Sequence, residues 1–142
     1  MRTVKNYIFL FLAFTSSSLL FAQSGTFRDS HGNYTGSATT KGDTTTYRDA
    51  HGNLAGSSTK NGDTTVYRDA HGNYIGSSTQ NGNTTTYRDA HGNFVGSASE
   101  NSGGGKTFRD SHGNFTGSAA TKGDTTTYRD AHGNYSGSFK GK

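Results

Sequence analysis

Large apolar side chains recur along the chain at fixed positions, and Gly, Ser, Thr and Asn fill the stretches between them. The spacing is 20 residues, except for one step of 21. Self-similarity at a fixed period is the signature of a repeating architecture. We therefore expect six units of about 20 residues, which begin at Phe27, Tyr47, Tyr67, Tyr87, Phe108 and Tyr128.

Each unit carries the signals of a β-hairpin. Residues 44–48 are rich in β-branched and aromatic side chains, which favours a strand. Asp49 and Gly52 stand at the first and fourth positions of a turn, which predicts a three-residue hairpin loop with Gly52 in the left-handed region. Residues 53–59 then return as a second strand, and the Asn-Gly pair at 61–62 favours another tight turn. Helix is disfavoured because Gly and β-branched residues interrupt every turn.

These signals predict an all-β fold, a repeat array of six hairpins that follow one another as a meander or hairpin spiral. The alternative is a β-solenoid with one rung per repeat. Equivalent residues would lie about 9–10 Å apart in the meander and about 4.8 Å apart in the rung stack. The turn chemistry favours the hairpins.

The sequence leaves the register of each hairpin open. A three-residue loop places Arg48 opposite Leu54 and Tyr47 opposite Ala55. A change of one residue instead lays Tyr47 over Gly56 and puts Tyr47 on the same face as Leu54. In the first register a guanidinium faces a large apolar or aromatic side chain, a favourable cross-strand pair. The corresponding pairs in other units are Arg68–Tyr74 and Arg88–Phe94.

One unit alone offers too little apolar surface to offset the ordering of its backbone. We expect equivalent side chains of all units to stack in two columns. The first column contains Phe27, Tyr47, Tyr67, Tyr87, Phe108 and Tyr128. The second contains Tyr34, Leu54, Tyr74, Phe94, Phe115 and Tyr135.

The first 22 residues have the layout of an export signal. Arg2 and Lys5 precede an apolar run at 7–14, and a short polar stretch leads to a second apolar group that ends at Ala22. This order predicts a secretory signal peptide over 1–22. The apolar run is too short for a membrane anchor. We expect the mature protein to be exported to the periplasm, the cell surface or the extracellular space, without a transmembrane segment.

The one irregular step divides the mature chain. Residues 23–101 hold repeats 1–4, and residues 107–142 hold repeats 5–6. Between them, 102–106 replace the usual Thr-rich stretch by a Gly-rich one. This composition predicts a flexible joint.

Composition narrows the classes of function. Apolar residues make up 27% of the chain, well below a globular domain, so a large core is excluded. The chain has no Cys, which excludes disulfides and thiolate metal sites. Without Arg2 and Lys5, 12 basic and 10 acidic side chains remain. Such a balance gives no field for nucleic acid, which we do not expect as a partner.

No catalytic or cofactor site is expected. Ser, His and Asp recur in the same places in every unit, whereas a catalytic site needs one constellation with distinct roles. We expect no metal either, because one His and one Asp per unit are too few for a zinc site. The alternative is a row of metal sites at the turn histidines His31, His51, His71, His91, His112 and His132. The six repeated Arg residues with their aromatic neighbours suggest a different site, for glycans or polyanions.

The pattern Tyr-Arg-Asp-x-x-Gly-x-x-x-Gly, seen at 67–76, resembles the tyrosine–aspartate (YD) repeats of bacterial Rhs-type surface and toxin-shell proteins. That resemblance implies β-hairpins, secretion and assembly at a surface. In size, export signal and repeat length the chain is also similar to curli-type secreted subunits, which implies self-assembly.

The expected function is therefore that of a secreted, non-enzymatic structural or adhesive protein of the cell envelope or surface. Open strand edges without Pro would allow self-association into oligomers or fibres. The alternative is an extracellular binding module that presents its Arg–aromatic rows or turn histidines to a glycan, a polyanion or a metal.

The export prediction is tested by N-terminal sequencing of the protein recovered outside the cytoplasm. Cleavage of a signal peptide gives a chain that starts near Gln23. A chain that remains in the cell and still carries its first 22 residues would contradict it.

Overall fold

A computed structural model describes residues 24–141, which form twelve β-strands. The predicted signal peptide at 1–22 lies outside the described residues. The strands are β1 (Gly25–Asp29), β2 (Tyr34–Lys41), β3 (Thr44–Asp49), β4 (Leu54–Asn61), β5 (Thr64–Asp69), β6 (Tyr74–Asn81), β7 (Thr84–Asp89), β8 (Phe94–Glu100), β9 (Lys106–Asp110), β10 (Phe115–Lys122), β11 (Thr125–Asp130) and β12 (Tyr135–Gly141). Within this part of the chain, no helix is long and apolar enough to cross a membrane.

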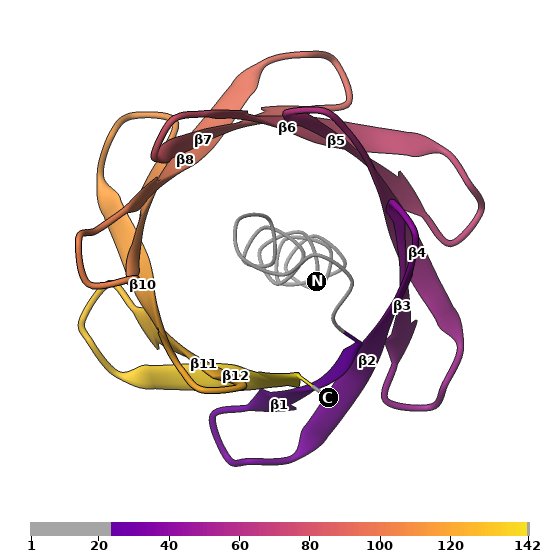
Figure 1. Cartoon of the computed structure of the whole chain (residues 1–142), viewed down its shortest axis with the longest axis horizontal. Coiled ribbons are helices and arrows are strands. Elements are labelled where there is room, and N and C mark those ends of the chain that lie inside the picture. Colours follow the sequence, from indigo (N-terminus) through magenta and orange to yellow (C-terminus); the bar gives the residue numbers. More distant parts are fainter. Residues whose placement is uncertain (1–23, 142) are drawn as a thin grey trace.

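The strands close into one antiparallel barrel (Figure 1). Each strand pairs with its neighbours in sequence, and β1 pairs with β12 to complete the ring. The all-β hairpin character is thus confirmed, but the open hairpin spiral and the β-solenoid are both wrong. Twist and coiling of a long meander bring its last strand back to its first, and closure satisfies both edges with backbone hydrogen bonds.

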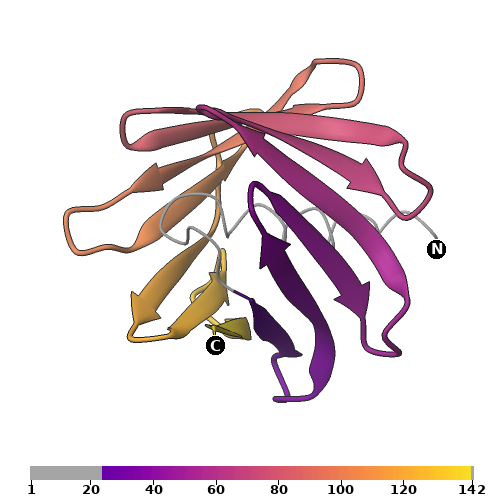
Figure 2. The same ribbon diagram turned by 45° about the vertical axis from the view of Figure 1, so that its right-hand side comes forward.

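The barrel has two different ends. The six loops with the Asp-x-His-Gly-Asn sequence lie at one end, which we call the histidine end. The tighter loops between units lie at the other, the glycine end, together with the start of β1 and the end of β12. The strands run obliquely between the two ends, as Figure 2 shows, which is the tilt that closure of a sheet requires.

A β-bulge in every hairpin decides which side chains face inward. Tyr47 pairs with Gly56 and Arg48 pairs with Leu54, so Ala55 is the extra residue between them. The structure therefore combines the two registers left open by the sequence. The pair Arg48–Leu54 comes from the first, and the pair Tyr47–Gly56 comes from the second. The extra residue lets Tyr47 face inward while Arg48 and Leu54 both face outward.

The first predicted column forms the core, and the second does not. The six aromatic residues that open the units are buried on the inner side of the barrel. The second column stays 38–47% exposed on the outer wall, which corrects the expectation that both columns pack between units. The reason is the register next to the loop, because Leu54 pairs with the outward-facing Arg48, whereas the bulge at Ala55 brings Gly56 inward opposite Tyr47.

Each inward aromatic residue lies beside a glycine that has no room for a side chain. Gly56, opposite Tyr47, has φ of 157°, and a Cβ placed on it would lie 2.5 Å from the carbonyl oxygen of Arg68. The ring of Tyr47 reaches past this strand position, and its hydroxyl lies 3.0 Å from Oγ of Ser58. Glycine is therefore required where the barrel wall meets the bulged strand.

The predicted joint at 102–106 lies in the loop that connects β8 and β9. The amide of Asn101 donates to the carbonyl of Gly105 at 2.8 Å, and the amide of Gly104 donates to the carbonyl of Asn101 at 3.0 Å. Lys106 already begins β9, and β8 and β9 pair directly across the loop. Repeats 1–4 and 5–6 therefore contribute to one barrel, and the extra residue of this step is absorbed in a loop.

Substitution of Gly56 by Ala tests the close approach at the bulge. The added methyl meets the Arg68 carbonyl, and we expect a loss of about 2–3 kcal/mol in the free energy of unfolding. The control is Gly103→Ala, because a Cβ at Gly103 meets nothing within 4 Å. Urea unfolding followed by circular dichroism measures both. Equal stability of the two variants would contradict the required role of Gly56.

Candidate functional site

The loop at the histidine end is organised by one aspartate. In the β5–β6 hairpin, Oδ1 of Asp69 accepts hydrogen bonds from the amides of His71 at 2.8 Å and Asn73 at 2.9 Å. Its Oδ2 accepts a third from Nδ2 of Asn73 at 2.9 Å. The amide of Gly72 donates to the Asp69 carbonyl at 3.1 Å, and Gly72 has φ of 85°. The predicted three-residue loop with a left-handed glycine is thus confirmed.

These contacts stabilise the charged form of the carboxylate. The side-chain hydrogen bond from Asn73 holds the pKa of Asp69 below its ordinary value, against a desolvation that raises it. The amides of Asn73 and His71 and the charge of His71 lower it further. The same downward shift of the pKa occurs at Asp29, Asp49, Asp89, Asp110 and Asp130. The hydrogen bonds of the Asp69 carboxylate stay within its own loop, and within residues 24–141 it forms no ion pair with the neighbouring arginine.

The arginine is held on the outer side of the same loop. Nη1 of Arg68 donates to the carbonyl of Gly72 at 2.9 Å. Its cross-strand partner is Tyr74, which is 40% exposed. Among the described residues, the guanidinium makes no ion pair, so most of its five N–H donors remain available to a ligand. A fixed cation and an exposed ring thus lie next to each other on the outer wall.

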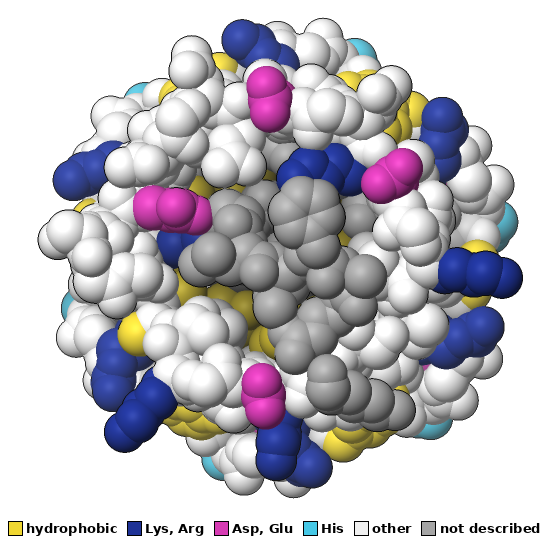
Figure 3. Space-filling model, viewed as in Figure 1, with side chains coloured by type: hydrophobic (Ala, Val, Ile, Leu, Met, Phe, Trp, Pro, Cys, Tyr) yellow, Lys and Arg dark blue, Asp and Glu magenta, His cyan; other side chains and the backbone are white. Residues whose placement is uncertain are grey.

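This arrangement occurs six times around the barrel. Each arginine donates through Nη1 to the loop glycine at 2.7–2.9 Å. We call the set the Arg–aromatic belt, although its second unit has Leu in place of an aromatic residue. The pairs are Arg28–Tyr34, Arg48–Leu54, Arg68–Tyr74, Arg88–Phe94, Arg109–Phe115 and Arg129–Tyr135. Basic side chains accordingly surround the whole periphery in Figure 3 and do not gather on one side.

The six turn histidines are all exposed at the tips of separate loops. They are His31, His51, His71, His91, His112 and His132. Within residues 24–141, no group of three His, Cys, Asp or Glu side chains is placed to hold a metal ion. Each histidine therefore lies in the loop of its own unit, and among the described residues none belongs to such a group of three.

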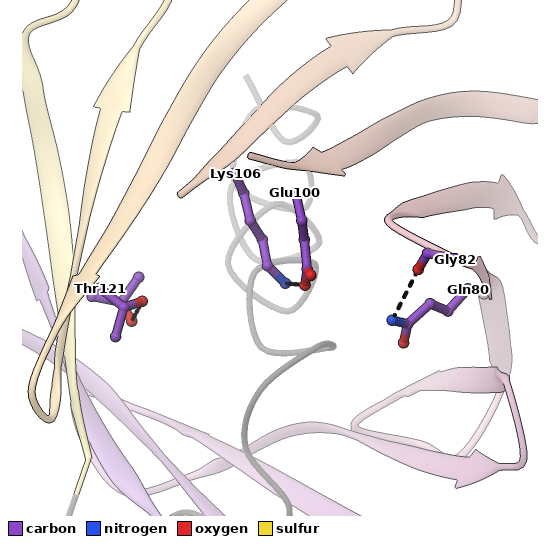
Figure 4. Close-up of polar contacts among 6 residues, drawn as sticks. Gln80, Gly82, Glu100, Lys106 and Thr121 are labelled. Atoms are coloured by element: carbon purple, nitrogen blue, oxygen red, sulfur yellow. Dashed lines mark hydrogen bonds and ion pairs between the residues drawn. The ribbon is translucent and has the colours of Figure 1, made fainter. Parts of the chain in front are cut away.

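Sequence reasoning missed one charged pair on the inner wall. Nζ of Lys106 on β9 lies 3.6 Å from Oε1 of Glu100 on β8, and Figure 4 shows both side chains pointing into the barrel. Burial lowers the pKa of Lys106, while the charge of Glu100 opposes that shift. The signal was present, because four other units have Thr and the first has Gly at the position of Lys106. A buried charge with one opposite partner is adequately explained as a structural pair.

No protein-family model matches the chain, and comparisons with curated proteins and with solved structures also give no match. The class of protein is defined by the fold alone, as a closed up-and-down antiparallel β-barrel built from six hairpins. The resemblances to YD repeats and to curli-type subunits stay predictions.

Because folding lowers the pKa of the loop aspartates, we expect the free energy of unfolding to fall in acid. A carboxylate whose pKa is lowered by folding stabilises the native state above its unfolded pKa, and this contribution is lost as pH falls through the folded value. We expect Asp69→Asn to lower stability at pH 7, and the difference from the parent to shrink below the ordinary pKa of 3.8. Denaturant unfolding at several pH values measures this difference.

The matched control is Asp63→Asn, because Asn83 occupies the equivalent position of the next unit. The carbonyl of residue 63, which accepts from the amide of Gln80, is retained in that variant. A difference between Asp69→Asn and the parent that stays constant from pH 7 to below 3.8 would contradict the proposed linkage.

Proposed function

We propose that the protein is a non-enzymatic adhesive protein of the cell exterior, which binds acidic polysaccharide through its Arg–aromatic belt. The main support is that each of the six units places an arginine beside an exposed aromatic or apolar side chain on the outer wall of the closed barrel. Export is supported by the layout of residues 1–22. A repeated surface that lacks distinct roles among its copies supports binding rather than catalysis.

The chemistry of the pair suits a sugar polymer that carries carboxylates or sulfates. A planar guanidinium binds such groups through two parallel N–H donors. The neighbouring ring offers an apolar face to the C–H side of a sugar, as aromatic side chains do for other flat ligand surfaces. Because Nη1 of Arg68 is already tied to the Gly72 carbonyl, less side-chain entropy is lost on binding.

Repetition compensates for the weakness of one pair. Equivalent residues of neighbouring hairpins lie two strands apart, about 10 Å across the strands. A polymer bound at one pair therefore meets the next at a high effective concentration, and avidity exceeds the single-site affinity by about 10²–10⁴-fold. The nearly balanced net charge of the exported chain implies that affinity comes from these local pairs rather than from a long-range field.

Closure of the barrel removes the free strand edges through which self-association was expected. Among the described strands every edge is paired, so fibres cannot grow from a free edge of the closed form. Adhesion through the outer wall does not depend on edges. We therefore prefer polymer binding by the Arg–aromatic belt to self-association as the basis of adhesion.

Replacement of three alternate arginines tests the belt. For Arg48→Gln, Arg88→Gln and Arg129→Gln combined, we expect affinity for an acidic polysaccharide such as polygalacturonate to fall by about 100-fold or more, because avidity is lost. A single replacement should cost only a few-fold. Isothermal titration calorimetry with polygalacturonate, neutral dextran and duplex DNA measures affinity and selectivity.

The control removes the same charge at the glycine end, through Lys41→Gln, Lys122→Gln and Lys140→Gln. Its affinity should change by less than about threefold at physiological salt, since screened charges act over about 8 Å. Equal losses in the two triple variants would show general electrostatic attraction instead of a belt. Lack of binding to the acidic polymer, or equal binding to dextran, would also overturn the proposal.

A further inference from the structure

The contact between β1 and β12 differs from every other contact between units. At each continuous junction a loop joins the two strands, as residues 42–43 join β2 and β3 and the longer 101–105 join β8 and β9. No loop joins β12 to β1, although the pairing is equivalent: Ser138 pairs with Arg28 as Ser37 pairs with Arg48. We call this contact the seam. It is the one place in the ring where two strands can separate without bending a short loop.

Side chains at the seam depart from the repeat in a coordinated way. Phe27 faces Phe139, and the ring centroids are 4.9 Å apart with planes inclined by 45°. The position of Phe139 in other units is occupied by small residues, namely Ala38, Ser58, Ser78, Ala98 and Ala119. A ring at this position is therefore specific to the seam.

Space for the additional ring comes from a glycine that is also specific to the seam. A Cβ on Gly25 would collide with the ring of Phe139. Other units carry Thr45, Thr65, Thr85, Lys106 and Thr126 at the position of Gly25. Position 139 thus has a larger side chain than its equivalents, and position 25 has a smaller one, so the two changes complement each other. Both Phe27 and Phe139 are buried. We call Gly25, Phe27 and Phe139 the clasp.

We propose that the seam is a second interaction surface, whose partner is another copy of this chain, and that the clasp holds the barrel closed against that exchange. When the seam opens, β1 presents a free edge in the register that β12 of a second copy requires. Head-to-tail exchange of these edges propagates into open chains of molecules. Intramolecular closure is favoured at low concentration because the two edges of one chain stay at an effective concentration in the millimolar range.

The first test restores the repeat residue at the seam through Phe139→Ser in the purified protein. We expect amide hydrogen exchange in β1 and β12 to become about 100-fold faster, because a buried ring is lost, while β6 and β7 keep their protection. Light scattering coupled to gel filtration, between about 10 µM and about 1 mM, should show oligomers that increase with concentration. The control Ala98→Ser makes the same residue at the equivalent position of β8 and should change neither result.

Uniformly faster exchange in all strands would show general destabilisation and would overturn the clasp as a seam-specific device. Unchanged exchange in β1 and β12, or a monomer at every concentration, would overturn it as well.

A circular permutant keeps the test decisive if Phe139→Ser does not fold. In this permutant Lys-Gly-Asp joins β12 to β1, as at 41–43, and the chain is opened between Gly82 and Asn83. The new seam between β6 and β7 lacks a clasp, so we expect more oligomer than in the parent. Adding Ser78→Phe and Thr85→Gly builds a clasp there and should restore the monomer. A permutant that is as monomeric as the parent without these two changes would contradict the proposal.

Discussion

The barrel depends on the contact between an inward aromatic side chain and the glycine opposite it in the same hairpin. Gly56 pairs with Tyr47 on one side, and on the other side a Cβ on Gly56 would collide with the Arg68 carbonyl of the next strand. The bulge beside this contact lets Gly56 face inward with Tyr47, while Leu54 faces outward with its partner Arg48. One local contact, repeated in each unit, thereby separates a thin apolar interior from a wall that carries exposed rings and cations.

Thin apolar content and a stable fold are compatible because closure removes the cost of unpaired backbone. A lone hairpin leaves two edges exposed, whereas here each strand has two hydrogen-bonded neighbours. Ser58 and Ser78 also face inward and are buried, and both accept or donate a hydrogen bond with a tyrosine hydroxyl at 3.0 Å. Polar residues can therefore occupy inner positions that larger apolar side chains fill in ordinary cores.

The sequence predicts what is encoded within one unit. Asp69, Gly72 and the spacing of the aromatics identify the loop, the hairpin and the buried column, because these depend on contacts between near neighbours. Closure was not predictable in the same way, since an open array and a ring share the same hairpins and turns. The pairing of Tyr67 with Gly76 depends on one bulged residue, Ile75, whose identity carries no bulge signal. Residues that depart from the repeat, such as Phe139 and Lys106, indicate the ring contact between β1 and β12 and the ion pair between β8 and β9. Averaging the six units into one consensus repeat hides them.

Pairing of Gly25 with Gly141 brings the two ends of the barrel chain together at the glycine end. A carrier fused directly to the start of β1 or the end of β12 would therefore be attached at that one face. The six histidine loops then project away from the attachment point, on the opposite face. A tether or a fused carrier and a ligand at the loops would occupy different sides of the molecule, so neither would sterically obstruct the other.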